Sequence, residues 1–104
     1  MSYLRNEFAY RDLMQQFIRM SLDADEFTCQ FLQQWRSDRD AQWAAISQGI
    51  KVSTEERAFS DIVDRAFIAV DCYSPTPSHT LHLSAVRLRV EISELFKRQW
   101  QTGD

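Results

Sequence analysis

Hydrophobic side chains recur every three or four residues in four stretches of the chain, and this spacing predicts four α-helices. The first predicted helix covers residues 3–20, with an apolar stripe made of Tyr10, Leu13, Met14, Phe17 and Met20. The last covers residues 84–101, with a stripe made of Ala85, Leu88, Ile92, Leu95 and Phe96. Each stripe occupies one side of its helix, so each helix is expected to bury that side against the others.

The second predicted helix begins at a capping box, in which Asp23 is the cap and Glu26 follows three residues later. Its apolar pattern starts at Phe27 and continues with Phe31 and Trp35 as far as residues 37–40. Residues 41–49 either extend this helix or form a separate turn, and the pattern leaves both arrangements open.

The third predicted helix begins at Ser53, where Glu56 completes a second capping-box pattern, and ends before Pro75. Proline lacks a backbone N–H and clashes with the preceding turn, so the helix cannot continue through it. At about 100° per residue, one half of this helix is apolar and consists of Phe59, Ile62, Val63, Ala66, Phe67, Val70 and Tyr73. The other half carries three carboxylates, which belong to Asp61, Asp64 and Asp71.

The composition fits a single packed domain over residues 1–104. Hydrophobic residues make up 44% of the chain and aromatic residues 12%, which excludes a disordered chain. With only two glycines and two prolines, the chain lacks the frequent turn signals that a β-sandwich or β-barrel requires. We therefore predict an all-α protein that folds as an antiparallel four-helix bundle.

Two further features bear on where the protein is found. The N-terminus has no secretory signal, and no apolar run is long enough to suggest a membrane span, so we expect a cytoplasmic protein. Cys29 and Cys72 lie within predicted helices and lack the spacing of a metal site. We interpret both as small buried side chains that remain reduced.

Negative charge is concentrated in the second and third predicted helices. The net charge is −3, and residues 21–40 and 54–73 each contain five acidic residues against two arginines. Such surfaces repel nucleic acid, so a direct nucleic-acid ligand is not expected, whereas a basic protein would be attracted. The alternative is that these carboxylates only keep exposed helix faces solvated.

Catalytic and metal-binding interpretations find little support. Asp61 and Asp64 are one turn apart without an apolar pocket that would separate their pKa values for acid–base chemistry. His79 and His82, with Cys72 upstream, suggest a metal site, but loop histidines exposed to solvent explain the same residues. No nucleotide-binding or hydrolase motif occurs. We predict that the protein is not an enzyme and needs no cofactor or metal.

Several residues resemble the pattern of the bacterial self-protective colicin-like immunity proteins, a family that includes immunity proteins of contact-dependent growth inhibition systems. Near the N-terminus these residues are Leu13, Phe17 and the pair Glu26-Phe27. Further on they are Asp61, Ile62, Phe67, Asp71, Tyr73, Ser74, Pro75, the run Leu88-Arg89-Val90, and Leu95. The chain departs from the family in its loop at residues 78–84, which lacks the usual acids, and in a longer insert around residues 43–52.

The resemblance implies an immunity protein that binds and neutralises a cognate bacterial toxin nuclease, one that cleaves tRNA. The nuclease cleft would be basic, and the acidic helix face would cover it. We expect the contacting residues to be Glu56, Asp61, Asp64, Asp71 and Tyr73. The alternative is a small helical adaptor or regulatory subunit that binds a partner through an apolar patch such as Val86, Val90 and Trp100. The oligomeric state does not follow from the sequence.

Overall fold

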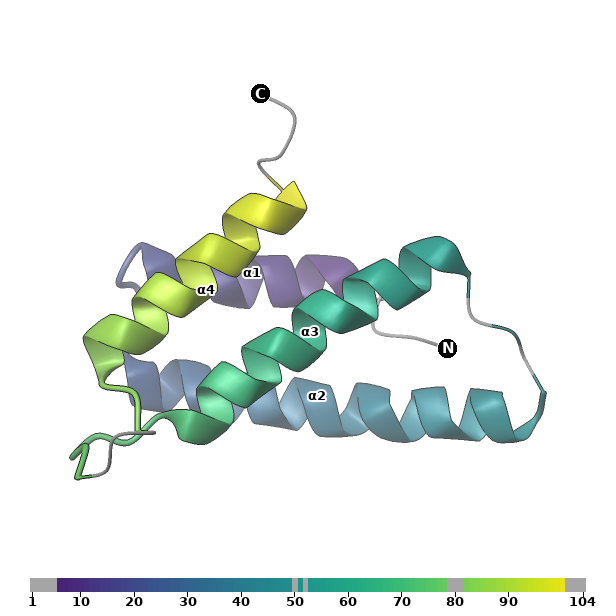
Figure 1. Ribbon diagram of the computed structural model, residues 1–104, viewed down its shortest axis with the longest axis horizontal. Coiled ribbons are helices and arrows are strands. Elements are labelled where there is room, and N and C mark those ends of the chain that lie inside the picture. The colour runs from purple at the N-terminus through teal and green to yellow at the C-terminus, as the bar shows by residue number, and fades with distance from the viewer. Residues whose placement is uncertain (1–5, 50, 52, 79–81, 101–104) are drawn as a thin grey trace.

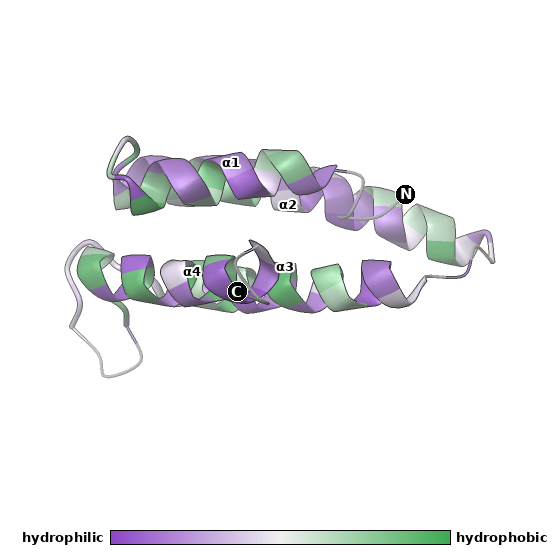
Figure 2. Cartoon of the chain, turned by 90° about the horizontal axis from the view of Figure 1, so that it is seen from above, coloured by the Kyte–Doolittle hydropathy of each residue, from purple (hydrophilic) through white to green (hydrophobic). Residues whose placement is uncertain are grey.

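Four helices form the part of the chain that the computed structural model describes, which is residues 6–49, 51, 53–78 and 82–100. They are α1 (Glu7–Ile18), α2 (Ala24–Ser47), α3 (Thr54–Cys72) and α4 (Ala85–Trp100). Consecutive helices run in opposite directions, and α1 and α2 form one layer while α3 and α4 form the other (Figures 1 and 2). The predicted all-α antiparallel four-helix bundle is confirmed.

Aromatic rings pack both within one layer and between the two layers. The ring of Phe17 in α1 stacks on Phe27 in α2, with their centroids 4.4 Å apart. Tyr10 contacts the edges of Phe31 and Phe59, which come from α2 and α3. All five side chains are at most 1% exposed. Each belongs to one of the predicted apolar patterns, so these patterns correctly identified the centre of the core.

The predicted helix starts are also found. The Asp23 carboxylate accepts the backbone N–H of Glu26 at 2.7 Å, and the Glu26 carboxylate accepts the backbone N–H of Asp23 at 3.2 Å. The Ser53 hydroxyl accepts the backbone N–H of Glu56 at 3.1 Å. These side chains satisfy N–H groups that have no partner within the helix, which sets where α2 and α3 begin.

The first helix is shorter than predicted, and Met20 is not part of its buried stripe. Met20 is 71% exposed and has a φ of 66°, in the left-handed region. Its N–H donates to the Phe17 carbonyl at 3.0 Å, and the Ser21 N–H donates to the Gln16 carbonyl at 2.8 Å. This pair of bonds ends a helix in the Schellman arrangement, which turns Met20 out of the apolar stripe.

Residues 41–47 continue the second helix, which resolves the alternative that the sequence left open. α2 is 24 residues long and extends beyond the other helices in Figure 1. The extension makes Asp38 an interior position of the helix. Asp38 is only 4% exposed, whereas the sequence pattern placed the end of the helix there.

Three neutral donors surround the buried Asp38 carboxylate. It accepts hydrogen bonds from the Asn6 amide at 2.6 Å, from the Tyr10 hydroxyl at 2.6 Å and from the Gln34 amide at 3.0 Å. A buried charge requires such partners, because it has lost its hydration. Asp38 thereby links the beginning of α1 to the middle of α2.

The interpretation of the cysteines as buried side chains was wrong for Cys29, which is exposed, and only half right for Cys72, which is partly exposed. Cys29 lies on the side of α2 opposite to Phe27 and Phe31, where it faces outward. Among the described residues no group of side chains has the composition of a metal site, and His79 lies outside them. No helix in the described ranges combines the length and apolar character needed to cross a membrane.

The apolar patch suggested for an adaptor protein does not form as one surface. Val86 and Val90 are exposed, but the Trp100 ring packs against Phe59 and Phe96. The Trp100 indole N–H also donates to the Glu7 carboxylate at 2.7 Å. Trp100 therefore joins α4 to α1 and α3 through its ring and its indole N–H.

Candidate binding face on helix α3

Three carboxylates lie on the outward side of α3. Asp61, Asp64 and Asp71 are all exposed, and they fall within about 80° of the helix circumference. The opposite side of the helix is buried through Ile62 and Ala66, so the core holds this side toward solvent. We call these three aspartates the α3 acidic face.

The two sides of this face border different helices. On one side, the Phe67 ring stacks on Trp35 of α2, with centroids 4.0 Å apart. By helical position, Asp64 and Asp71 lie on this α2 side. On the other side, Arg65 and Ala69 border a groove shared with Glu91 of α4. The acidic face is thus bordered by an aromatic contact with α2 on one side and by a groove beside α4 on the other.

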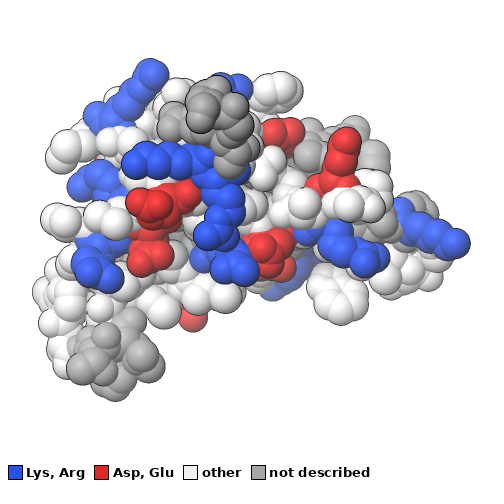
Figure 3. Space-filling model, turned by 45° about the horizontal axis from the view of Figure 1, so that its top comes forward, with Lys and Arg blue, Asp and Glu red and all other residues white. Residues whose placement is uncertain are grey.

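Basic residues interrupt the acidic face. The Arg65 guanidinium lies 2.9 Å from the Asp61 carboxylate in an exposed pair one helical turn apart. Figure 3 shows Lys and Arg interleaved with Asp and Glu on the side of the molecule that it presents. Among the described residues, no cation lies within ion-pair distance of Asp64 or Asp71. These two residues are therefore the net negative part of the face.

The Asp64 carboxylate is held in an unfavourable environment. Partial burial, together with the nearby charge of Asp61, raises the pKa of Asp64 above its ordinary value of 3.8. A raised pKa means that folding disfavours the ionised form, so ionised Asp64 slightly destabilises the fold at neutral pH. The charge of Asp64 therefore does not contribute to the stability of the fold.

Tyr73 joins the end of α3 to the beginning of α2. It follows the last residue of the helix, and its hydroxyl donates to the Asp25 carboxylate at 2.8 Å. Partial burial, this hydrogen bond, and the charges of Asp25 and Asp23 raise the pKa of Tyr73 to about 12. The phenol thus remains a neutral donor at physiological pH.

This contact brings the Asp25 carboxylate beside the end of α3, with the charge of Asp23 nearby. From the sequence, Asp23 was considered only as a helix cap, and Asp25 was not connected with Tyr73. In an antiparallel pair of neighbouring helices, the start of one lies beside the end of the other. The predicted topology therefore contained the signal that Asp25 and Tyr73 are close in space.

The hydrogen bond between Tyr73 and Asp25 predicts a stability difference that depends on pH. Tyr73→Phe should lower the free energy of unfolding by about 0.5–1 kcal/mol at neutral pH, because the bond is exposed to solvent. Since the folded pKa is raised above the unfolded value near 10, this contribution is fully present below pH 10. It should be lost between pH 10 and about 12. Urea unfolding of the original protein and of Tyr73→Phe at pH 7, 10 and 11.5 measures the difference in their free energies of unfolding. The same difference at all three pH values would contradict this prediction.

Glu56 lies apart from the other candidate residues. It belongs to the first turn of α3, and its carboxylate accepts a hydrogen bond from the Ser53 hydroxyl at 3.2 Å. Fifteen residues of helix place it about 22 Å from Asp71 along the axis. Asp71 and Tyr73 therefore lie at the end of α3, Asp64 lies near its middle, and Glu56 lies in its first turn.

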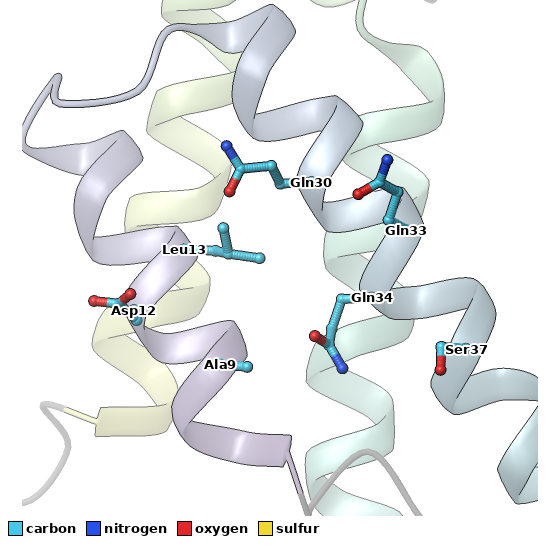
Figure 4. Close-up of a pocket in the computed structure, with 7 residues that line it drawn as sticks. All are labelled: Ala9, Asp12, Leu13, Gln30, Gln33, Gln34 and Ser37. Carbon is cyan, nitrogen blue, oxygen red and sulfur yellow. The ribbon is translucent and has the colours of Figure 1, made fainter.

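A second surface feature lies on the opposite layer of the molecule. A groove of about 440 Å³ separates α1 from α2 (Figure 4). Its lining consists of Ala9, Asp12, Leu13, Gln30, Gln33, Gln34 and Ser37. None of the candidate residues lines it. The polar lining of the groove is mainly glutamine amides, and the amide of Gln34 is already hydrogen-bonded to Asp38. Among the described residues, no nucleophile in the groove is hydrogen-bonded to a base, so the lining does not indicate nucleophilic catalysis.

A comparison with known protein families shows to which family the chain belongs. Residues 7–98, which extend from the first residue of α1 almost to the end of α4, match the family described as bacterial self-protective colicin-like immunity. The chain belongs to this family. Proteins of the colicin-like immunity family protect the bacterium that makes a toxin by neutralising that toxin. No curated protein and no solved structure gives a significant match to the chain.

Proposed function

We propose that this protein binds a cognate toxin nuclease in the cytoplasm of the producing cell and blocks its active cleft. The toxin is a nuclease that cleaves tRNA, as the resemblance described above implies. The observation that carries the proposal is the α3 acidic face, which a member of an immunity family holds outward on a rigid helix. Inhibition requires only binding, so the protein itself performs no catalysis.

Electrostatic complementarity is the physical basis of the proposal. A cleft that binds RNA carries lysine and arginine to contact phosphates, and a helix with spaced carboxylates offers it a similar arrangement of negative charge. Asp64 and Asp71 supply unpaired charge, and Asp61 shares its charge with Arg65. Tyr73 contributes its ring at the end of the helix, and Glu56 extends the contact toward the other end of α3.

The salt dependence of binding tests this mechanism. Association of charged surfaces is accelerated by long-range attraction, which salt screens over about 8–10 Å. We expect the association rate with the toxin domain to fall at least tenfold between 50 and 500 mM NaCl, with a smaller change in the dissociation rate. The toxin domain used should carry an inactivating substitution in its nuclease site. An association rate that is the same at both salt concentrations would contradict the acidic-face mechanism.

A further inference from the structure

An exposed isoleucine lies within the α3 acidic face. Ile68 is 62% exposed on the same side of α3 as the aspartates. It follows Asp64 by four residues and precedes Asp71 by three, so one carboxylate lies a turn before it and the other a turn after it. Ile68, the apolar residue of this face, therefore lies between Asp64 and Asp71, which form no ion pair among the described residues.

Ile68 also borders a formed groove between α3 and α4, the helices that lie side by side in one layer (Figures 1 and 2). The groove has a volume of about 330 Å³, and its lining consists of Arg65, Ile68, Ala69, Cys72, Leu83 and Glu91. Four of these six residues are apolar. The groove therefore has room for one large apolar side chain beside Ile68.

One end of this groove, at Cys72 and Leu83, is held by backbone hydrogen bonds. The Leu83 N–H donates to the Cys72 carbonyl at 2.8 Å, and the Ser74 N–H donates to the Leu83 carbonyl at 2.9 Å. These bonds join the segment before α4 to the end of α3. A partner that enters the groove would not have to order this end, which lowers the entropic cost of binding.

The charges around the groove indicate the chemistry of its occupant. Arg65 contributes little net charge because it pairs with Asp61 at 2.9 Å. Glu91 on the α4 side, like Asp64 and Asp71, forms no ion pair among the described residues. Asp64 and Asp71 lie on the α2 side of Ile68, and Glu91 lies on the α4 side of the groove. Carboxylates therefore flank Ile68 on two sides, an arrangement complementary to an apolar side chain that has basic neighbours.

We propose that the α3–α4 groove receives one apolar side chain of the toxin, flanked on the toxin by lysine or arginine, and that Ile68 is its main contact. This proposal rests on the proposed function, because it takes the toxin as the partner. Buried apolar anchors near the centre of an interface typically account for most of the binding energy, while surrounding charges steer association. Ile68 should accordingly control how slowly the complex dissociates.

Matched substitutions of exposed apolar residues test the anchor. Ile68→Ala should weaken binding to the inactivated toxin domain at least tenfold, mainly through faster dissociation, with an unchanged salt dependence of the association rate. Alanine favours helix, so folding should be preserved. Ile68→Leu, which keeps the apolar volume, should bind within about threefold of the original protein. Val86→Ala is the control, because Val86 is 67% exposed on α4 and does not line the groove; it should change affinity less than about threefold.

The outcomes separate this proposal from the proposed function. If Ile68→Ala binds the toxin as tightly as Val86→Ala, the anchor is wrong, although a salt-dependent association rate would still support the acidic face. If Ile68→Ala weakens binding while the association rate ignores salt, the groove is supported and the acidic mechanism is wrong. If Ile68→Ala leaves toxin binding unchanged but lowers the sedimentation coefficient of the free protein, the groove joins two copies of this chain, and the proposal is overturned.

Discussion

Replacing Asp64 and Asp71 by lysine should abolish stable binding to the toxin while leaving the fold intact. Each substitution replaces an exposed carboxylate with a lysine, whose positive charge repels the basic residues of the toxin cleft. Close charge pairs across an interface contribute about 1.5–7 kcal/mol each. We expect a loss of at least about 4 kcal/mol, which is roughly a thousandfold in affinity. Titration calorimetry and a growth-protection assay with the toxin expressed in the same cell would measure the loss.

The same double substitution should leave the stability of the free protein nearly unchanged. The pKa of Asp64 is raised by partial burial and by Asp61, so removing its negative charge relieves repulsion within the face. A control with an equal change in net charge is Asp12→Lys with Asp40→Lys, since both residues are exposed and lie on the α1 and α2 layer. That variant should retain most of the affinity. Equal losses from both double variants would show that overall charge, and not the α3 acidic face, determines binding.

Removing the buried carboxylate of Asp38 should cause the largest loss of stability. Asp38→Ala deprives the donors of Asn6, Tyr10 and Gln34 of a shared acceptor and leaves a small cavity. Hydrogen bonds to a charged group contribute about 1.5–3 kcal/mol, and buried donors that lose such an acceptor add to the cost. We expect a loss of about 3 kcal/mol and a fall in Tm of more than about 10 °C, measured by circular dichroism.

A matched control lies two residues away in the same helix. Asp40 is exposed, and its carboxylate contacts only its neighbour Arg39 at 3.2 Å among the ion pairs of the described residues. Asp40→Ala should therefore change the free energy of unfolding by less than about 0.5 kcal/mol. If Asp38→Ala were no more destabilising than Asp40→Ala, the network at Asp38 would not hold α1 against α2.

The parts of the fold that were predicted correctly depend on local rules. The caps at Asp23 and Ser53 need only residues within one turn of each other, and the apolar stripe through Phe59, Ile62 and Val63 follows from the helical period. Such features are contained in short windows of sequence. The helix count, the antiparallel order and the centre of the core followed from them.

The features that were missed depend on contacts between distant segments. Asp38 has the composition of a surface residue, and only its contacts with Asn6 and Tyr10, about thirty residues earlier in the chain, explain its burial. Trp100 was assigned to a surface patch because its partner Glu7 is at the other end of the chain. Likewise, the bond from Tyr73 to Asp25 spans 48 residues. Hydrophobic periodicity carries no information about such pairs.

If the α3 acidic face occupies the nuclease cleft in place of RNA, this protein must displace tRNA from the toxin domain. Labelled tRNA is bound to the inactivated toxin domain, and this protein is then added while the fluorescence anisotropy of the tRNA is followed. Our expectation is complete release of tRNA at one equivalent of the original protein and no release by the Asp64→Lys, Asp71→Lys variant. A ternary complex, in which the toxin holds both tRNA and this protein, would contradict it.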